Sequence, residues 1–179
     1  MACRLLLVSG SLRRLSASTA ALRAAAHVAP PGVTAVVYER LAHLPPFNPD
    51  EDVEPLHPEV VFLRGEVHAA GAIVFSTPEY AGALPGSFKN LLDWTIGDDQ
   101  AGSIYEKPVA WLNTSPRGAE GAHRELRTVL GYAHATVVEP ACQAVPVTNA
   151  MLGPDGTLTD QAAVERLRAA IGALTAAAC

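Results

Sequence analysis

A chain of 179 residues, of which 49% are hydrophobic and 17% charged, has the size and composition of one globular domain and is too apolar to be disordered. Its formal net charge is -5 and its longest basic run is the pair Arg13 and Arg14, which excludes nucleic-acid binding through many phosphate contacts.

The sequence shows neither a recognisable targeting segment nor a cysteine motif. The aliphatic run near the N-terminus covers only residues 5–8, which is too short for a signal-peptide core or a membrane span. We therefore expect a cytoplasmic protein without membrane contact. Cys3, Cys142 and Cys179 are widely spaced and form no C-x-x-C motif, so we expect buried or incidental thiols and no disulfide framework.

Strand-like and helical stretches alternate along the chain. Apolar, β-rich runs predict strands at residues 5–8, 33–38, 72–75, 108–112 and 136–138, the last extending toward residue 145. Helical patterns predict helices at about residues 18–28, 57–69, 85–96, 119–132 and from 160 toward the C-terminus. Prolines exclude regular structure from residues 44–49, and an acidic loop follows them.

This alternation predicts a single α/β domain over residues 1–179, with a doubly wound, five-stranded parallel sheet covered by helices on both faces. The pattern does not fix the order of the strands. The flavodoxin-like order 2-1-3-4-5 sets the loops after strands one, three and four side by side, at the carboxyl ends where such sheets bind ligands. A Rossmann-like order is the alternative and needs a sixth strand that the pattern lacks.

The loop after the first strand has the composition of an anion site. It combines a small-residue turn at Gly10, several hydroxyl side chains, the guanidinium of Arg13 and the start of a helix, whose free N–H groups favour anions. It lacks both G-x-G-x-x-G and G-x-x-x-x-G-K-[ST], so a dinucleotide turn or a nucleoside triphosphatase is disfavoured. The pattern favours a terminal phosphate monoester; an ordinary serine-rich helix cap with a surface arginine is the alternative.

The loop after the third strand, residues 77–86, contains two prolines and two glycines, which fix its backbone and let a flat ligand approach closely. Tyr80 adds an aromatic ring with a polar end. A planar heterocycle fits this loop, although by itself the segment also reads as a simple strand–helix connection.

Two groups of residues carry a resemblance to a known family. Gly10-Ser11-Leu12-Arg13, followed by the pattern P-E-Y-x-x-x-x-P-G-x-x-K-N-x-x-D-W from Pro78 to Trp94, closely resembles the NADPH-dependent FMN reductases. That family is flavodoxin-like and includes quinone, azo-dye and chromate reductases. The resemblance spans about residues 4–140 and implies bound FMN, NADPH or NADH as co-substrate, and a homodimer or homotetramer.

The resemblance also implies roles for particular residues. By position, the FMN phosphate is held by the first loop, the isoalloxazine lies against the second, and the segment 115–118 closes the third side. The implied cofactor-binding residues are Ser11, Arg13, Ser16, Ala17, Ser18, Pro78, Glu79, Tyr80, Ala81, Ser115 and Arg117. Because the flavin carries the chemistry, no side chain is expected to act as a catalytic acid, base or nucleophile.

The chain departs from the family pattern at two positions. Ser18 stands where the family often has Asn, which replaces an amide donor by a hydroxyl. Ala81 also stands where Asn is common, which removes a polar side chain near the ring.

The sequence gives less information about metal binding and about contacts between subunits. The six histidines show no close ligand spacing, so we expect no metal site. Two interpretations of Trp94 stay open: it is a simple core residue, or it lies with Lys89, Asn90 and Asp93 on a helix face left for solvent or a partner subunit. The second interpretation follows if the apolar face of this helix lies at other positions.

Three functions compete at this stage. The first is an FMN-dependent NAD(P)H oxidoreductase that reduces small acceptors by ping-pong hydride transfer, with quinones, free flavin, azo compounds or metal oxyanions as acceptors. The second is a non-enzymatic electron carrier like flavodoxin, and the third is a cofactor-free binding module on the same fold. The small residues Ala81, Gly82 and Ala83 favour the enzyme, because they leave a ring face open to nicotinamide.

Overall fold

The computed structural model of the protein describes residues 3–178. One sheet in the order β2-β1-β3-β4-β5 runs through the molecule, and all of its paired strands are parallel. The strands are β1 (Cys3–Ser9), β2 (Val33–Tyr38), β3 (Ala72–Ser76), β4 (Pro108–Asn113), β5 (Thr136–Val137) and β6 (Gln143–Ala144). The expected flavodoxin-like order is confirmed.

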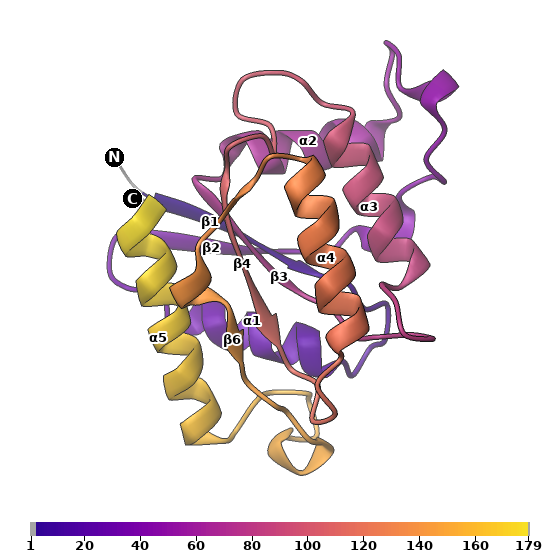
Figure 1. The fold of residues 1–179 in the computed structure, drawn as a ribbon. Helices are drawn as coiled ribbons and strands as arrows, with labels where there is room; N and C mark the ends of the chain where they lie inside the picture. The colour runs from indigo at the N-terminus through magenta and orange to yellow at the C-terminus, as the bar shows by residue number, and fades with distance from the viewer. Residues whose placement is uncertain (1–2, 179) are drawn as a thin grey trace.

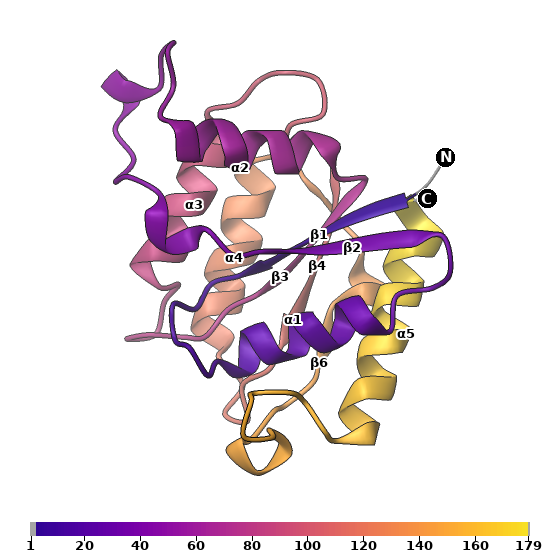
Figure 2. The same ribbon diagram turned by 180° about the vertical axis from the view of Figure 1, so that it is seen from behind.

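Five α-helices cover the sheet: α1 (Ala17–His27), α2 (Pro58–Ala69), α3 (Gly86–Ile96), α4 (Glu120–Tyr132) and α5 (Gln161–Ala178). Figures 1 and 2 show α1 and α5 on one face of the sheet and α2, α3 and α4 on the other. Side chains along β1 point alternately to the two faces of the sheet. Leu5 and Leu7 pack on the side of α1 and α5, and Leu6 and Val8 pack on the side of α2, α3 and α4.

The expected continuous fifth strand is replaced by two short ones. β5 pairs with the start of β4, and β6 pairs with the end of β4 at Leu112 and Asn113. A 3-10 turn, Glu139–Ala141, separates them. Pro140 lies in this turn and has no N–H to donate, which explains the interruption.

Trp94 lies inside its own chain, so its interpretation as a core residue is confirmed and the alternative of an outward-facing Trp94 is wrong. Its side chain is 0% exposed, its Nε1 donates to the carbonyl oxygen of Pro45 at 2.9 Å, and its ring meets Phe47 edge-on at 4.9 Å. Asn90 donates to the same carbonyl at 2.9 Å and accepts from the N–H of Phe47 at 2.7 Å. The loop rich in prolines therefore folds back over α3.

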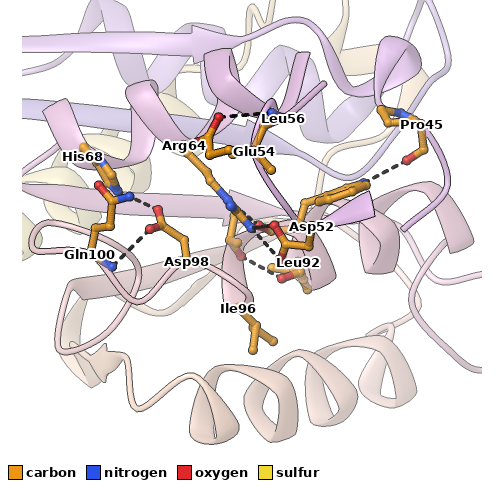
Figure 3. A network of polar contacts seen from close by, with 12 residues as sticks. Pro45, Asp52, Glu54, Leu56, Arg64, His68, Leu92, Ile96, Asp98 and Gln100 are labelled. Atoms are coloured by element: carbon orange, nitrogen blue, oxygen red, sulfur yellow. Dashed lines mark hydrogen bonds and ion pairs between the residues drawn. The ribbon is translucent and has the colours of Figure 1, made fainter. Parts of the chain in front are cut away.

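An ion pair closes the other end of this loop. Arg64 of α2 donates Nη2 to both carboxylate oxygens of Asp52, at 2.8 and 2.9 Å, and Nε to the carbonyl oxygen of Trp94 at 3.1 Å. Figure 3 shows these contacts beside a second pair, in which His68 Nε2 lies 2.6 Å from Asp98. The contacts of Arg64 and His68 together hold the proline-rich loop, α2 and the C-terminal end of α3 against one another.

The cysteines differ from expectation at one position. Cys3 is disulfide-bonded, so an incidental thiol is wrong there, whereas Cys142 is free and half-buried. Cys179 lies outside the described residues. Among residues 3–178, no helix combines the length and apolar character that a membrane crossing requires.

Candidate functional site

A cavity of about 400 Å³ lies at the carboxyl edge of the sheet, where the loops after β1, β3 and β4 meet. Ligands bind at this edge of doubly wound sheets. Its lining residues are Ser11, Arg13, Ser16, Ala17, Ser18, Pro78, Glu79, Tyr80, Thr114, Ser115, Pro116, Arg117, Ala119 and Val147.

The β1–α1 loop brings the start of α1 to the cavity. Ser16 is the N-cap of α1, and its hydroxyl accepts from the N–H of Thr19 at 3.4 Å. The N–H groups of Ala17 and Ser18 belong to the first helical turn, where no intrahelical partner exists. Both residues line the cavity, so the positive end of the helix dipole points toward a ligand there.

Gly10 allows this loop to pack against its neighbour. A Cβ atom at position 10 would lie 2.8 Å from the ring of Phe88 and closer still to the hydroxyl of Thr77. The N–H of Gly10 donates to the carbonyl oxygen of Ser76 at 2.8 Å. Only glycine permits this approach, so the single glycine of the loop joins the first and second cavity walls.

Arg13 supplies the positive charge of this end of the cavity. Its backbone N–H donates to Ser11 Oγ at 3.3 Å, which fixes the turn. Its guanidinium makes no ion pair or hydrogen bond within residues 3–178 and therefore keeps all its donors for a ligand. One unpaired guanidinium beside a helix N-terminus is a site for a phosphate or carboxylate.

The β3–α3 loop forms a tight hairpin beside the cavity. Tyr80 and Ala83 exchange two backbone hydrogen bonds of 3.1 Å, and the two residues between them, Ala81 and Gly82, have φ of 52° and 78°. Two positive φ values in a two-residue hairpin are the signature of a type I′ turn. Ala81 therefore occupies the turn and is not among the residues that line this cavity. Its contact with a ligand stays a prediction.

Two carboxylates fasten this hairpin to α4. Ala119, the N-cap of α4, has no side chain to cap the helix, and Glu79 accepts from the N–H of Ala122 at 2.9 Å in its place. Glu125 of α4 accepts in return from the N–H of Leu84 at 2.7 Å. The Glu79 carboxylate is thus a helix cap supplied from another loop, which was not foreseen.

The β4–α4 loop closes the third side. Asn113 accepts from the N–H of Ser115 at 3.0 Å and donates Nδ2 to the carbonyl of Gly118. The hydroxyl of Ser115 accepts from the N–H of Arg117 at 3.2 Å. Ser18 and Thr114 share a buried hydroxyl–hydroxyl contact of 3.2 Å, which ties this loop to the start of α1.

The structure brings together ten of the eleven residues that the sequence singled out; the exception is Ala81. Four lining residues were missed as individual positions. Thr114, Pro116 and Ala119 lie in the same loop as the predicted residues Ser115 and Arg117, so their position in that loop could have identified them. Val147 lies in the segment after β6, and its own N–H donates to the carbonyl oxygen of Thr114 at 3.0 Å. No sequence pattern indicated this residue.

His123 of α4 lines a separate cavity, together with Trp111 and Arg127. His123 Nδ1 lies 2.8 Å from the carbonyl oxygen of Ala119, and its Nε2 is buried without a partner within the described residues. Burial lowers the pKa of His123 below its usual value, against smaller opposing effects of the Ala119 carbonyl and Glu79. His123 is therefore neutral at pH 7 and adds no charge. Residues 3–178 hold no group of three side chains suited to a metal.

Comparison with known proteins agrees with this geometry. Residues 3–150 match the family model of the NADPH-dependent FMN reductases. The chain belongs to this family. It is 30% identical over 173 residues to a quinone reductase of Escherichia coli, a match that covers 93% of this chain and 89% of that protein.

Two further relatives match over shorter lengths. An NAD(P)H-dependent FMN reductase of Pseudomonas aeruginosa is 34% identical over 125 residues, 69% of this chain and 66% of the relative. A probable NADPH:quinone oxidoreductase of Oryza sativa is 38% identical over 96 residues, 52% of this chain and 47% of the relative. The aligned parts thus span less than two thirds of these two proteins.

Solved structures share the fold. FerB, a flavoenzyme NAD(P)H:(acceptor) oxidoreductase from Paracoccus denitrificans, superposes with a TM-score of 0.79 at 23% identity, covering 97% of this chain and 96% of FerB. The NADH:FMN oxidoreductase EmoB gives a TM-score of 0.66 at 16% identity, covering 99% of this chain and 90% of EmoB.

Proposed function

We propose that residues 1–179 form a single FMN-binding domain that oxidises NAD(P)H and reduces small acceptors. The observation that carries this proposal is the cavity itself. In a chain of the FMN reductase family, it joins a helix N-terminus with an unpaired arginine at one end to a rigid, glycine-containing hairpin at the other.

The residues at the first end fit the phosphate of FMN. The N–H groups of Ala17 and Ser18 and the guanidinium of Arg13 are donors, and a phosphate monoester offers only acceptors at neutral pH. Ser11 and Ser16 add hydroxyls beside them. Riboflavin lacks the phosphate and leaves these donors without a partner, so FMN is the flavin that this end selects.

The residues at the second end fit a planar ring. Pro78, Glu79 and Tyr80 on one side and Ser115 and Arg117 on the other line the cavity between two loops that hydrogen bonds hold rigid. Such pre-organised walls orient a flat ligand without further loss of conformational entropy. FMN bound here supplies hydride acceptance from NAD(P)H and hydride donation to the acceptor.

The side chains themselves have no acid–base role in this proposal. Glu79 is the only carboxylate among the described residues that line the cavity, and it is engaged with the start of α4. The chain instead binds, orients and shields the flavin. Tyr80 is 50% exposed at the mouth, so a nicotinamide and an acceptor can use the same open site in turn.

This open site supports ping-pong exchange with quinones, free flavin, azo compounds or metal oxyanions. The competing functions predict different results for purified protein. A cofactor-free module shows no flavin absorbance, and an electron carrier shows flavin bands but no steady turnover. We expect flavin bands, stronger binding of FMN than of riboflavin, and continuous NAD(P)H oxidation with a quinone. Absence of FMN binding in titrations would contradict the proposal.

We also propose that the protein acts in the cytoplasm and assembles as a homodimer or homotetramer. The family resemblance supports assembly, and the exposed ring of Tyr80 at the cavity mouth provides an apolar surface for a second copy.

A further inference from the structure

The backbones of α4 and of the β3–α3 hairpin meet beside the cavity of about 400 Å³ that we propose for FMN (the first cavity). A Cβ atom at Gly121 of α4 would lie 2.1 Å from the carbonyl oxygen of Gly82 and 2.9 Å from its carbonyl carbon. Figure 1 shows the start of α4 beside the loop that leads into α3. Both contacted atoms belong to the backbone, so no side-chain rotation relieves the overlap, and only glycine permits this approach.

The helix itself does not require a glycine here, since glycine is among the least favourable residues in helices. Gly131 lies in the last turn of the same helix. Among residues 3–178, apart from its chain neighbours and its own helix backbone, no atom lies within 4 Å of the place that a Cβ at Gly131 would occupy. Alanine therefore fits at position 131, whereas at position 121 it displaces the hairpin.

Two hydrogen bonds hold the hairpin at this contact. Glu79 accepts from the N–H of Ala122 at 2.9 Å, and Glu125 accepts from the N–H of Leu84 at 2.7 Å. One oxygen of Glu79 also lies 3.0 Å from the place of a Cβ at Gly121. A side chain at position 121 is therefore accommodated only when these attachments stretch or break.

The contact determines how far apart two walls of the first cavity lie. Residues 78–80 form one wall and directly precede the turn that contains Gly82. Residues 114–117 and Ala119 form the other wall and directly precede α4. Moving a Cβ from 2.1 Å to an ordinary contact distance of about 3.5 Å displaces one wall relative to the other by about 1 Å. The start of α1, at the phosphate end, belongs to neither wall.

We infer that Gly121 is a positioning residue of the proposed reaction: it sets the width of the ring end of the first cavity, and with it the orientation of a flavin ring held there. The inference rests on the proposed function, because it concerns the same cavity. Gly121 is not among the lining residues and acts through the backbone of Gly82. Orientation matters for hydride transfer, since a misplacement of about 1 Å can lower a rate by about 100-fold.

The test compares Gly121→Ala with Gly131→Ala, which adds the same methyl group to the same helix. We expect Gly121→Ala to raise the Kd of FMN and that of riboflavin by the same factor, about tenfold, because both flavins share the ring. The absorbance band of the bound flavin should shift, and kcat for NADPH oxidation by FMN-saturated protein should fall by about 10- to 100-fold. In Gly131→Ala all of these quantities should stay within about twofold of wild type.

A second variant decides the matter if circular dichroism shows that Gly121→Ala does not fold. Glu125→Ala removes the attachment at Leu84 and adds no atoms, so the hairpin loses part of its pre-organisation. We expect the Kd of both flavins to rise by about threefold, with a shifted flavin band. Wild-type values of both quantities in Glu125→Ala would then overturn the inference.

Three results with folded Gly121→Ala would overturn the inference while the oxidoreductase stands. The first is wild-type Kd and kcat, and the second is an equal loss in Gly131→Ala. The third is weaker binding of FMN with unchanged binding of riboflavin, which would place the effect at the phosphate end. Wild-type protein that binds neither flavin would instead refute the proposed function.

Discussion

The guanidinium groups of Arg13 and Arg117 in the first cavity have no partner within residues 3–178, whereas Glu79 is engaged with α4. Of the two arginines, Arg13 belongs to the loop that leads into α1, where we propose that the phosphate binds. We expect Arg13→Ala to weaken FMN binding by about 1.5–3 kcal/mol, or about 10- to 100-fold in Kd, as for other charge-assisted contacts. Riboflavin affinity should change little, because it lacks the phosphate. Fluorescence titration with both flavins measures this difference, and an unchanged Kd for FMN would refute the phosphate assignment.

Ala81 shows how a single φ angle changes the interpretation of a substitution. An L-residue in the left-handed region costs about 1–2 kcal/mol, and Ala81 has a φ of 52°. Asn tolerates this region and, before Gly82, completes the Asn-Gly pair that type I′ turns prefer. We expect Ala81→Asn to raise the free energy of unfolding by about 1 kcal/mol in urea titrations. Loss of stability in this variant would show that the turn is not strained at this position.

At the scale of elements, α4 depends on a cap from outside the helix. Glu79 binds the N–H of Ala122, and its negative charge also lies at the positive end of the helix dipole. We expect Glu79→Ala to destabilise the protein by about 1–2 kcal/mol and to weaken FMN binding, because the hairpin loses one of its two attachments to α4. Glu120→Ala, in the exposed first turn of α4, is the control. Equal stability of the two variants in denaturant titrations would exclude the capping role.

The helices and strands also show which features could be predicted from the sequence and which could not. Strands and helices with strong periodicity, and the flavodoxin-like order, followed from local patterns and the family resemblance. The broken fifth strand was missed because Pro140 was not weighed against its β-rich neighbours. The Glu79–Ala122 contact joins residues 43 positions apart, and no local pattern encodes such a pair. The position of Trp94 stayed open for the same reason, since its burial depends on a loop that folds back from about 49 positions earlier.

At the scale of the molecule, Trp94 connects three parts of the chain: α3, the loop through Pro45 and Phe47, and Arg64 of α2 through its own carbonyl. Trp94→Phe keeps an aromatic ring but removes the donor to Pro45 and some volume. We expect it to lower the free energy of unfolding by about 1–3 kcal/mol without changing the oligomeric state. Thermal unfolding and sedimentation of the same sample measure both properties. If the variant changes its oligomeric state while its free energy of unfolding stays the same, Trp94 contributes to a subunit contact after all.

With Trp94 inside its own chain, a subunit contact must come from other surfaces. Tyr80 is 50% exposed at the cavity mouth, and Tyr132, 77% exposed near the end of α4, is an equally large ring away from it. Because a two-fold contact buries the same patch on both copies, one substitution in that patch acts twice. We expect wild type to sediment at a multiple of the 18.7 kDa chain mass, and Tyr80→Ser to shift it toward the monomer while Tyr132→Ser does not. A single 18.7 kDa species at micromolar concentration would exclude assembly. An equal shift in both variants would instead place the contact away from the cavity mouth.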